Sequence, residues 1–324
     1  MLAEWLRPVL SLPTSWDQFW FRAGLPQRLG NTRVAIGAVA LIQFLVYCAW
    51  VPDWLSGHGW FDSETGRFFI GEGLPDTGSD FRWSPLFRWP SPMVARSICI
   101  LGGIASAATM AGIGSRLAPL LAWGCMMTIH HRAPWLTLPA EFLLSAGLLY
   151  LVIDTGRIGW SWRPARFDSE GVPRTSVKLA TRCIQVHFLI WLACCFASML
   201  QQDVWWNGSA ISILSEQGHG LLGPIDRESW MGQAMTLVML LLPAAAIACW
   251  SRIATYPLGF IAILAFAVAV ALFAGDGLYA LAMLAMSVSL LPLGRSEDRA
   301  IPYDSAILPR PIEFAAPLHQ VRTP

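Results

Sequence analysis

Two histidines and an arginine stand side by side in this sequence. His130, His131 and Arg132 occupy the stretch TIHHRAPW, between two segments that are almost free of charge. A histidine can take up or release a proton near neutral pH, and a guanidinium can hold an anionic or carbonyl oxygen. Glu141 is the nearest acidic residue in the sequence and could orient a histidine. These four residues predict an outward-facing polar pocket, in which His131 or His130 is the candidate base if the protein is an enzyme.

A simpler interpretation of the same residues stays open. Ionisable side chains at the end of a membrane helix often extend to the lipid headgroups and have no further role. Ionisable groups within a membrane otherwise face the interior of a bundle, where they pair with one another. Three adjacent polar residues are more than anchoring needs, so we expect them to line a pocket, with headgroup anchoring as the alternative.

The composition predicts the elements that must position these residues. Of the 324 residues, 55% are hydrophobic and 13% are charged, whereas a soluble protein carries about 25% charged residues. Several uncharged runs reach the ~18 residues that a transmembrane helix needs. The sequence therefore predicts an all-α polytopic membrane helix bundle of about eight transmembrane helices, without a soluble domain. The expected spans lie near residues 33–52, 95–115, 116–135, 139–154, 181–202, 229–251, 253–275 and 277–294.

Two of these segments are short for a membrane. The uninterrupted hydrophobic pieces cover residues 117–129 and 142–153, and a helix of about 13 residues rises only ~20 Å against a hydrocarbon core of ~30 Å. Either these pieces do not span, or the polar residues between them lie within the membrane. Both versions place Lys and Arg in excess on the side of the two termini, so the positive-inside rule predicts cytoplasmic termini.

The same pattern divides the chain into three regions. Residues 1–32 form a cytoplasmic amino terminus, in which the aromatic segment SWDQFWFRAGLPQRL predicts an interfacial helix. Residues 33–294 form the transmembrane bundle, and residues 295–324 form a cytoplasmic tail too short to fold alone. The first outer loop is long and rich in tryptophan, which suits a belt at the headgroups. We expect a multi-pass membrane protein.

Gln185 and His187 are further polar residues inside an expected span. Positions two apart on a helix point about 200° apart, so at most one of them can face a given cavity squarely. Both are candidates for lining the pocket. The alternative for each is a buried hydrogen bond to a neighbouring helix.

Other classes of site are disfavoured. All seven cysteines lie inside or at the ends of apolar runs, without the spacing of metal ligands, which argues against a zinc site and a disulfide framework. The adjacent Cys194 and Cys195 are interpreted as small apolar packing residues. A net charge of +1 indicates no nucleic-acid partner. The expected partner is the lipid bilayer, and the sequence identifies no protein partner.

Several ordered stretches resemble one known family. The entry WDQFWFRAGLPQRLGNTRVAIGAVALI, the loop pieces GWFDSETG and RWSPLFRW, and the helices GIGSRLAPLLAWGCMMTIHHR and RCIQVHFLIWLACCFASMLQQDVWWNGSAI are similar to the horizontally transferred transmembrane domain family. These proteins are bacterial relatives of the membrane part of vitamin K-dependent gamma-carboxylase. The resemblance runs from about Trp16 to Ser212 and depends on the order and spacing of five weak motifs.

The resemblance implies a membrane bundle whose outer cavity accepts a reduced quinone. In the carboxylase, a lysine ahead of a W-x-x-G element deprotonates that quinol. The element matches Trp205 to Gly208 here, and the base position falls on Met199 or Leu200, neither of which can accept a proton. The only lysine, Lys178, is expected on the cytoplasmic side. The resemblance therefore implies a shared pocket, with the histidine-rich turn at a polar position of the family, but not glutamate carboxylation.

The leading hypothesis is thus a carboxylase-like membrane bundle that lacks the carboxylase lysine and binds a quinone or another lipophilic molecule. A non-enzymatic structural or partner-binding membrane subunit, with the aromatic first outer loop as its contact surface, is the alternative. Transport is less favoured, because the sequence shows no inverted repeat or pair of broken helices.

Overall fold

A computed structural model describes residues 12–24, 26–56, 59–60, 62, 68, 84–133, 138–156, 174–217, 223–226, 229–250 and 255–291 of the chain. Within these residues the protein is helical and has no strand, apart from one isolated antiparallel bridge between Gly24 and Arg174. The all-α prediction is confirmed for this part of the chain. Most of residues 57–83, in the expected first outer loop, and the tail 295–324 lie outside the described residues.

Among the described residues, five segments are long and apolar enough to cross a membrane. They are α3 (Pro26–Trp50) with η1 (Val51–Leu55), α6 (Pro92–Ala111), α9 (Thr175–Leu200), α12 (Trp230–Trp250), and α13 (Tyr256–Ala269) with η5 (Val270–Ala274). Large aliphatic side chains on these helices are exposed; Leu241, for example, is 59% exposed. Monomeric soluble proteins rarely expose such extensive apolar surface. The five helices indicate a multi-pass membrane protein.

The remaining helices are shorter. They are α2 (Leu12–Phe21), α5 (Pro85–Arg88), α7 (Leu117–Arg132), α8 (Pro139–Leu151), α10 (Asp203–Trp206), α11 (Ala210–Glu216), and α14 (Gly277–Ser287) with η6 (Val288–Leu290). Three of the eight expected spans correspond to α7, α8 and α14, which do not reach the length of the other five. The aromatic amino-terminal segment is divided between α2 and the first turns of α3, which begins at Pro26.

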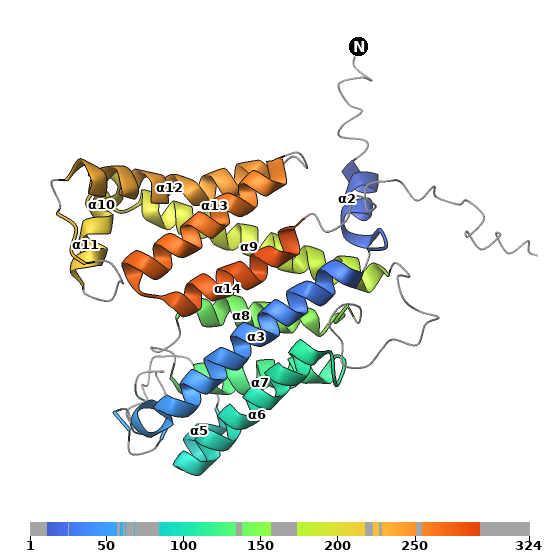
Figure 1. Ribbon diagram of the computed structural model, residues 1–324. Coiled ribbons are helices and arrows are strands. Elements are labelled where there is room, and N and C mark those ends of the chain that lie inside the picture. The colour runs from blue at the N-terminus through green and yellow to red at the C-terminus, as the bar shows by residue number, and fades with distance from the viewer. Residues whose placement is uncertain are drawn as a thin grey trace, which may run out of the picture. The chain divides into compact units, whose positions relative to one another are not determined.

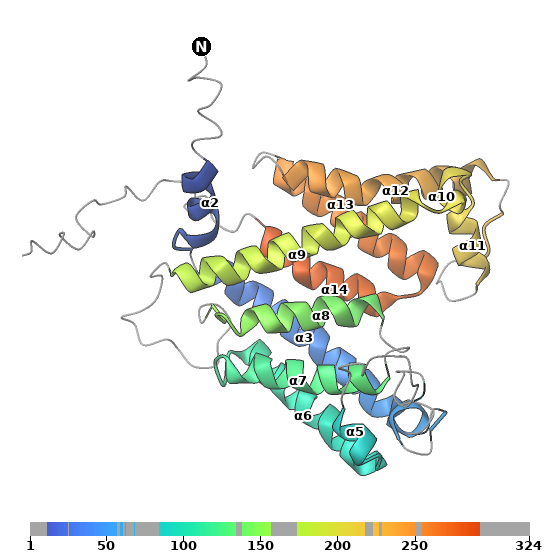
Figure 2. The same cartoon turned by 180° about the vertical axis from the view of Figure 1, so that it is seen from behind.

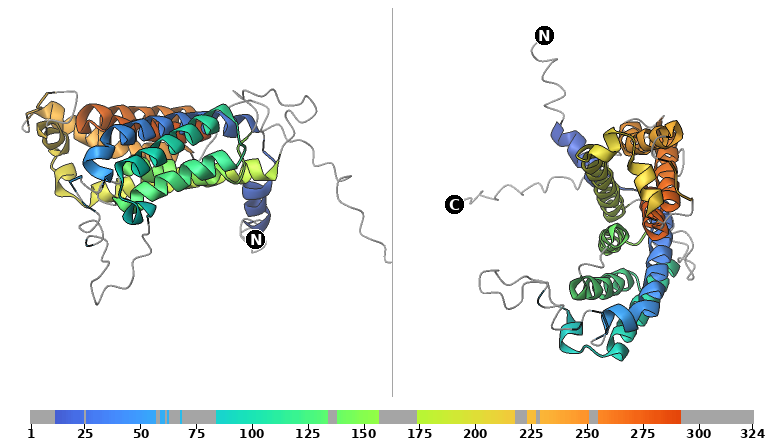
Figure 3. Two further views of the ribbon diagram at one scale, coloured as in Figure 1. Left: turned by 90° about the horizontal axis from the view of Figure 1, so that it is seen from below. Right: turned by 90° about the vertical axis from the view of Figure 1, so that its left-hand side faces the viewer.

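The helices pack in two layers. Seen end-on, α7, α8 and α9 lie side by side in one layer, and α3, α14 and α13 face them in the other (Figure 3). Helix α6 packs on α3 and α7, and α12 packs on α9 and α13 (Figures 1 and 2). Successive long helices run in opposite directions (Figure 1), so the bundle has an entry end, where α3 begins, and a far end, where α3 finishes. The ends of α7 and α9 and the starts of α6, α8 and α14 lie at the far end.

The closest contact in this arrangement joins α3 to α6. A Cβ atom on Gly37 would lie 2.7 Å from the backbone nitrogen of Met110, and one on Gly102 would lie 2.3 Å from the ring of Phe44. Small residues allow membrane helices to approach this closely, and dispersion contacts then hold them together. The glycines therefore determine the separation of the two helices.

Arg33 marks the entry end of the same pair of helices. Its side chain is fully buried, and its guanidinium lies against Gly112, which ends α6 in the left-handed conformation with φ 73°. A cation near the carboxyl end of a helix interacts favourably with the helix dipole and the terminal carbonyl groups. Helix α6 thus ends on a buried positive charge supplied by α3.

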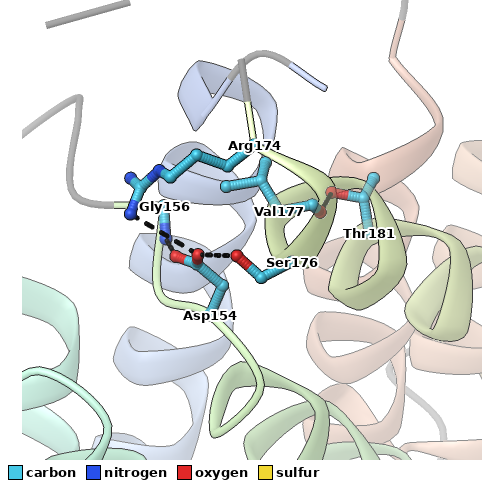
Figure 4. A network of polar contacts seen from close by, with 6 residues as sticks. All are labelled: Asp154, Gly156, Arg174, Ser176, Val177 and Thr181. Carbon is cyan, nitrogen blue, oxygen red and sulfur yellow. Dashed lines mark hydrogen bonds and ion pairs between the residues drawn. The ribbon is translucent and has the colours of Figure 1, made fainter. Parts of the chain in front are cut away.

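A second polar network at the entry end joins the end of α8 to the start of α9 (Figure 4). The buried carboxylate of Asp154 accepts hydrogen bonds from the Ser176 hydroxyl at 2.6 Å and the Gly156 backbone N–H at 2.9 Å. Arg174 lies 3.6 Å from the same carboxylate and exchanges two backbone hydrogen bonds with Gly24, just ahead of α3. The network fastens three chain segments and satisfies the backbone where α8 has ended.

Replacement of Gly37 should test the close contact. We expect Gly37→Ala to lower the free energy of unfolding by about 1–3 kcal/mol, because the new methyl group meets backbone atoms of Met110 that cannot move aside. Gly124→Ala is the matched control, since no atom lies within 4 Å of the added Cβ. Thermal unfolding in detergent, followed by circular dichroism, measures both. Equal midpoints for the two variants would contradict the packing role.

Substitutions in the Asp154 network should lower the free energy of unfolding by different amounts. Asp154→Ala removes the acceptor for a buried hydroxyl and a backbone N–H, and we expect a loss of about 1–3 kcal/mol. Arg174→Ala should cost less than about 1 kcal/mol, because its side chain is 42% exposed and exposed ion pairs contribute little. The same unfolding measurement ranks them, and an Arg174→Ala effect as large as that of Asp154→Ala would refute the assignment.

Candidate functional site

Glu141 is the centre of a buried polar group at the far end of the bundle. It lies in the first turn of α8, and its side chain is 1% exposed. One carboxylate oxygen accepts hydrogen bonds from the Gln43 amide at 2.9 Å and the Tyr47 hydroxyl at 2.7 Å. The other oxygen accepts from the backbone N–H of Leu138. The carboxylate therefore joins α3 to α8 and caps the start of α8.

The local sequence explains why these groups meet. Pro139 stands at the first position of α8, where its missing N–H costs no hydrogen bond. Glu141 then lies where the partial positive charge of the helix amino terminus stabilises a carboxylate. Gln43 and Tyr47 are four residues apart and therefore lie on one face of α3. Asp276, which caps α14, is close enough to interact electrostatically with Glu141.

His130 lies in the last turn of α7, at the same end of the bundle as Glu141. Its side chain is 7% exposed, and its Nε2 atom has no hydrogen-bond partner among the residues that the structure describes. Its ring packs 6.3 Å from that of Phe142, the residue after Glu141. A buried imidazole nitrogen of this kind can donate to a carbonyl oxygen or accept from a hydroxyl, depending on its tautomer.

Arg132, the last residue of α7 and two residues after His130, is fully buried. Its guanidinium carbon lies 5.2 Å from the centre of the Phe87 ring, and Asp62 interacts with it electrostatically. The face of an aromatic ring attracts a cation. His131 is only half-buried and, being one residue from both neighbours, points in a different direction from each. The structure therefore buries His130 and Arg132 but not His131.

Residues 84–88, within the RWSPLFRW piece, pack against this turn of α7. Ser84 caps α5 by accepting from the Leu86 backbone N–H, and its hydroxyl donates to the Thr128 carbonyl of α7 at 2.7 Å. Leu86 and Phe87 are buried beneath it. The loop residues from 84 to 88 thus hold Phe87 against Arg132.

Gln185 and His187 lie elsewhere. Gln185 donates to the Ser289 carbonyl of η6 and accepts from Arg182 at 2.8 Å, toward the entry end. His187 contacts the Tyr150 hydroxyl at 3.2 Å. Tyr150 follows Glu141 by nine residues, which is about 13 Å of helix rise. Both side chains therefore make contacts between helices, as the alternative interpretation expects, and neither joins the group at Glu141.

The expected positions of the family base are at the far end of α9. Met199 and Leu200 form its last turn, and the Leu200 carbonyl accepts a hydrogen bond from Trp206 Nε1 at 2.8 Å. Lys178 lies in the first turn of α9, on the order of 30 Å away along the helix. The ammonium group of the only lysine therefore cannot act near the W-x-x-G element.

Gln43 and Tyr47 were not foreseen. Gln43 is an amide inside an otherwise apolar run, and a buried amide in a membrane helix needs a partner. That feature was the available signal, and the four-residue spacing to Tyr47 would have placed both on one helix face. Glu141 is 98 residues from Gln43, so the sequence did not indicate which acid they would contact.

Neither a metal site nor a known relative helps to identify the site. Among the described residues, no three His, Cys, Asp or Glu side chains are grouped so that they could hold a metal ion. No protein-family model, curated protein or solved structure matches the chain.

Substitution of Glu141 should show how the site is held. We expect Glu141→Ala to lower the free energy of unfolding by about 1–3 kcal/mol, because it leaves the buried donors of Gln43 and Tyr47 without their acceptor. Glu141→Gln retains one acceptor oxygen and should lose less. Thermal unfolding in detergent measures the difference, and identical midpoints for both variants and the unmodified protein would contradict this arrangement.

Proposed function

We propose that the protein is an integral membrane protein that binds a quinone, or another lipophilic molecule with carbonyl or hydroxyl groups, at the far-end group of Glu141, Gln43, Tyr47, His130 and Arg132. The observation that carries the proposal is the burial of Glu141 and His130 at one end of an apolar bundle, with no hydrogen-bond partner for His130 Nε2 among the described residues. Ionisable groups in membrane segments are costly to bury and mark functional sites.

The chemistry of the group fits a quinone headgroup. A quinone presents two carbonyl oxygens, and a hydroquinone presents two hydroxyls. Nε2 of His130 can serve either form according to its tautomer, and a guanidinium donates to an anionic or carbonyl oxygen. Phe142 and Phe87 supply aromatic surface beside them. If a reaction occurs, His130 is the better placed of the two candidate bases, because it is the one whose side chain is buried at this end of the bundle.

The topology and family are part of the same proposal. We assign eight crossings with both termini in the cytoplasm of a bacterium, in its inner membrane, which puts the far end outside. The support is the distribution of Lys and Arg and the alternating direction of the helices. The resemblance to the horizontally transferred transmembrane domain family supports the quinone, and the RWSPLFRW motif of that resemblance packs on Arg132. With Met199 and Leu200 at the base position, carboxylation is not the proposed reaction.

The amount of quinone that remains bound to the purified protein tests the proposal. We expect the protein purified in mild detergent to contain extractable quinone, and His130→Ala and Arg132→Gln to retain roughly tenfold less, the loss of about one good hydrogen bond. Extraction with organic solvent and mass spectrometry quantify it. Arg174→Ala, at the entry end, is the control and should retain the normal amount.

Size-exclusion elution and thermal unfolding separate loss of ligand from loss of fold in these variants. Absence of any quinone or other lipophile from the unmodified protein, or equal retention by all variants, would overturn the proposal. That result would favour the non-enzymatic subunit, with His130 and Arg132 serving only as anchors.

A further inference from the structure

The register between α3 and α6 brings two cysteines together. A Cβ on Gly37 would lie 2.9 Å from Met110 Cα, and one on Gly103 would lie 3.7 Å from Phe44 Cβ. The second contact is seven residues further along α3 and seven residues earlier in α6, so the antiparallel pairing is constant over two turns. One more turn toward the far end places Cys48 opposite Cys99.

The side chains agree with this register. The thiols of Cys48 and Cys99 interact with each other, and Cys125 of α7 contributes a third thiol nearby. All three are free thiols; Cys99 and Cys125 are buried, and Cys48 is partly buried. A disulfide needs Cα atoms about 4.4–6.8 Å apart. The glycines Gly37, Gly102 and Gly103 favour a short separation, because they let the α3 and α6 backbones approach more closely than larger side chains would allow.

The thiol pair adjoins the far-end site. Tyr47, whose hydroxyl donates to Glu141, precedes Cys48 in the chain and interacts electrostatically with Cys99. A molecule held at Glu141 therefore lies next to a pair of thiols that belong to two different helices. Quinones accept two electrons and two protons, which are what a pair of thiols releases when it forms a disulfide.

We infer that Cys48 and Cys99 form a redox-active dithiol that exchanges two electrons with a quinone at the Glu141 site. In the oxidative direction the two S–H bonds break and one S–S bond forms. The two electrons and two protons pass to the quinone, whose carbonyl oxygens become the hydroxyls of a hydroquinone. The electron exchange rests on the proposed function, whereas the pairing of the two cysteines rests on the α3–α6 register alone.

Two oxidants distinguish these parts. Full-length protein in lipid nanodiscs is reduced, freed of reductant without oxygen, and treated with either decylubiquinone or diamide, a thiol oxidant that needs no quinone site. After denaturation and alkylation, non-reduced peptides are analysed by mass spectrometry. We expect both oxidants to give a peptide linked through Cys48 and Cys99, with one hydroquinone formed per disulfide when decylubiquinone is used.

Substitutions test whether the disulfide forms between Cys48 and Cys99 and whether decylubiquinone reacts at the Glu141 site. Cys48→Ser and Cys99→Ser should abolish the linked peptide, and Cys249→Ser, a thiol on another helix, should leave it unchanged. Tyr47→Phe should slow the reaction with decylubiquinone about tenfold while leaving the reaction with diamide unaffected. Thermal unfolding of each variant verifies its fold.

Other results of the two oxidation reactions overturn either the cysteine pairing or the electron exchange. Failure of diamide to link Cys48 to Cys99, or linkage of Cys99 to Cys125 in its place, overturns the pairing even if quinone is bound. Linkage by diamide but not by decylubiquinone overturns the electron exchange. Whether the purified protein carries quinone then decides separately whether the proposed function fails with it.

Discussion

The contact between Glu141 and α3 is the interaction on which the far end of the bundle depends. A carboxylate in an apolar bundle must be compensated for the water it has lost, and here the compensation comes from an amide, a phenol and a backbone N–H. The two side-chain donors belong to α3, while the carboxylate and the N–H belong to α8 and its cap. The polar group therefore aligns the two layers, and it does so where His130 and Arg132 are also buried.

The close packing of α3 against α6 complements this polar contact. Without a hydrophobic driving force between helices in lipid, association depends on dispersion and on hydrogen bonds. Gly37 and Gly102 give α3 and α6 the close dispersion contact, and Glu141 gives α3 and α8 the directional one. Helix α3 takes part in both, with Gln43 and Tyr47 toward α8 and Phe44 toward α6.

The sequence predicted the helical class and the membrane character, because composition and the length of apolar runs depend only on neighbouring residues. It also indicated His130, Arg132 and Glu141 as candidates, since the ends of α7 and α8 are close in the chain. The role of Gln43 and the meeting of Cys48 with Cys99 depend on contacts between residues about 50 to 100 positions apart, for which one sequence contains no direct signal. Gln185 and His187 were ambiguous for a related reason, because a polar side chain in a helix reveals its need for a partner but not which partner it finds.

The Asp154 network also stabilises a non-helical extension of the short helix α8. Helix α8 has 13 residues and rises only ~20 Å, but the chain continues through a turn and then without helix from Asp154 to Gly156. Extended backbone advances about twice as far per residue as a helix, so the stretch from Pro139 to Gly156 can reach on the order of 30 Å, similar to the hydrocarbon thickness of a bilayer. Such backbone is tolerated at depth only where its polar groups are satisfied within the protein, and Asp154 meets part of that need by accepting from Gly156. A short helix with a buried, hydrogen-bonded extension can thus traverse the same distance as a long one.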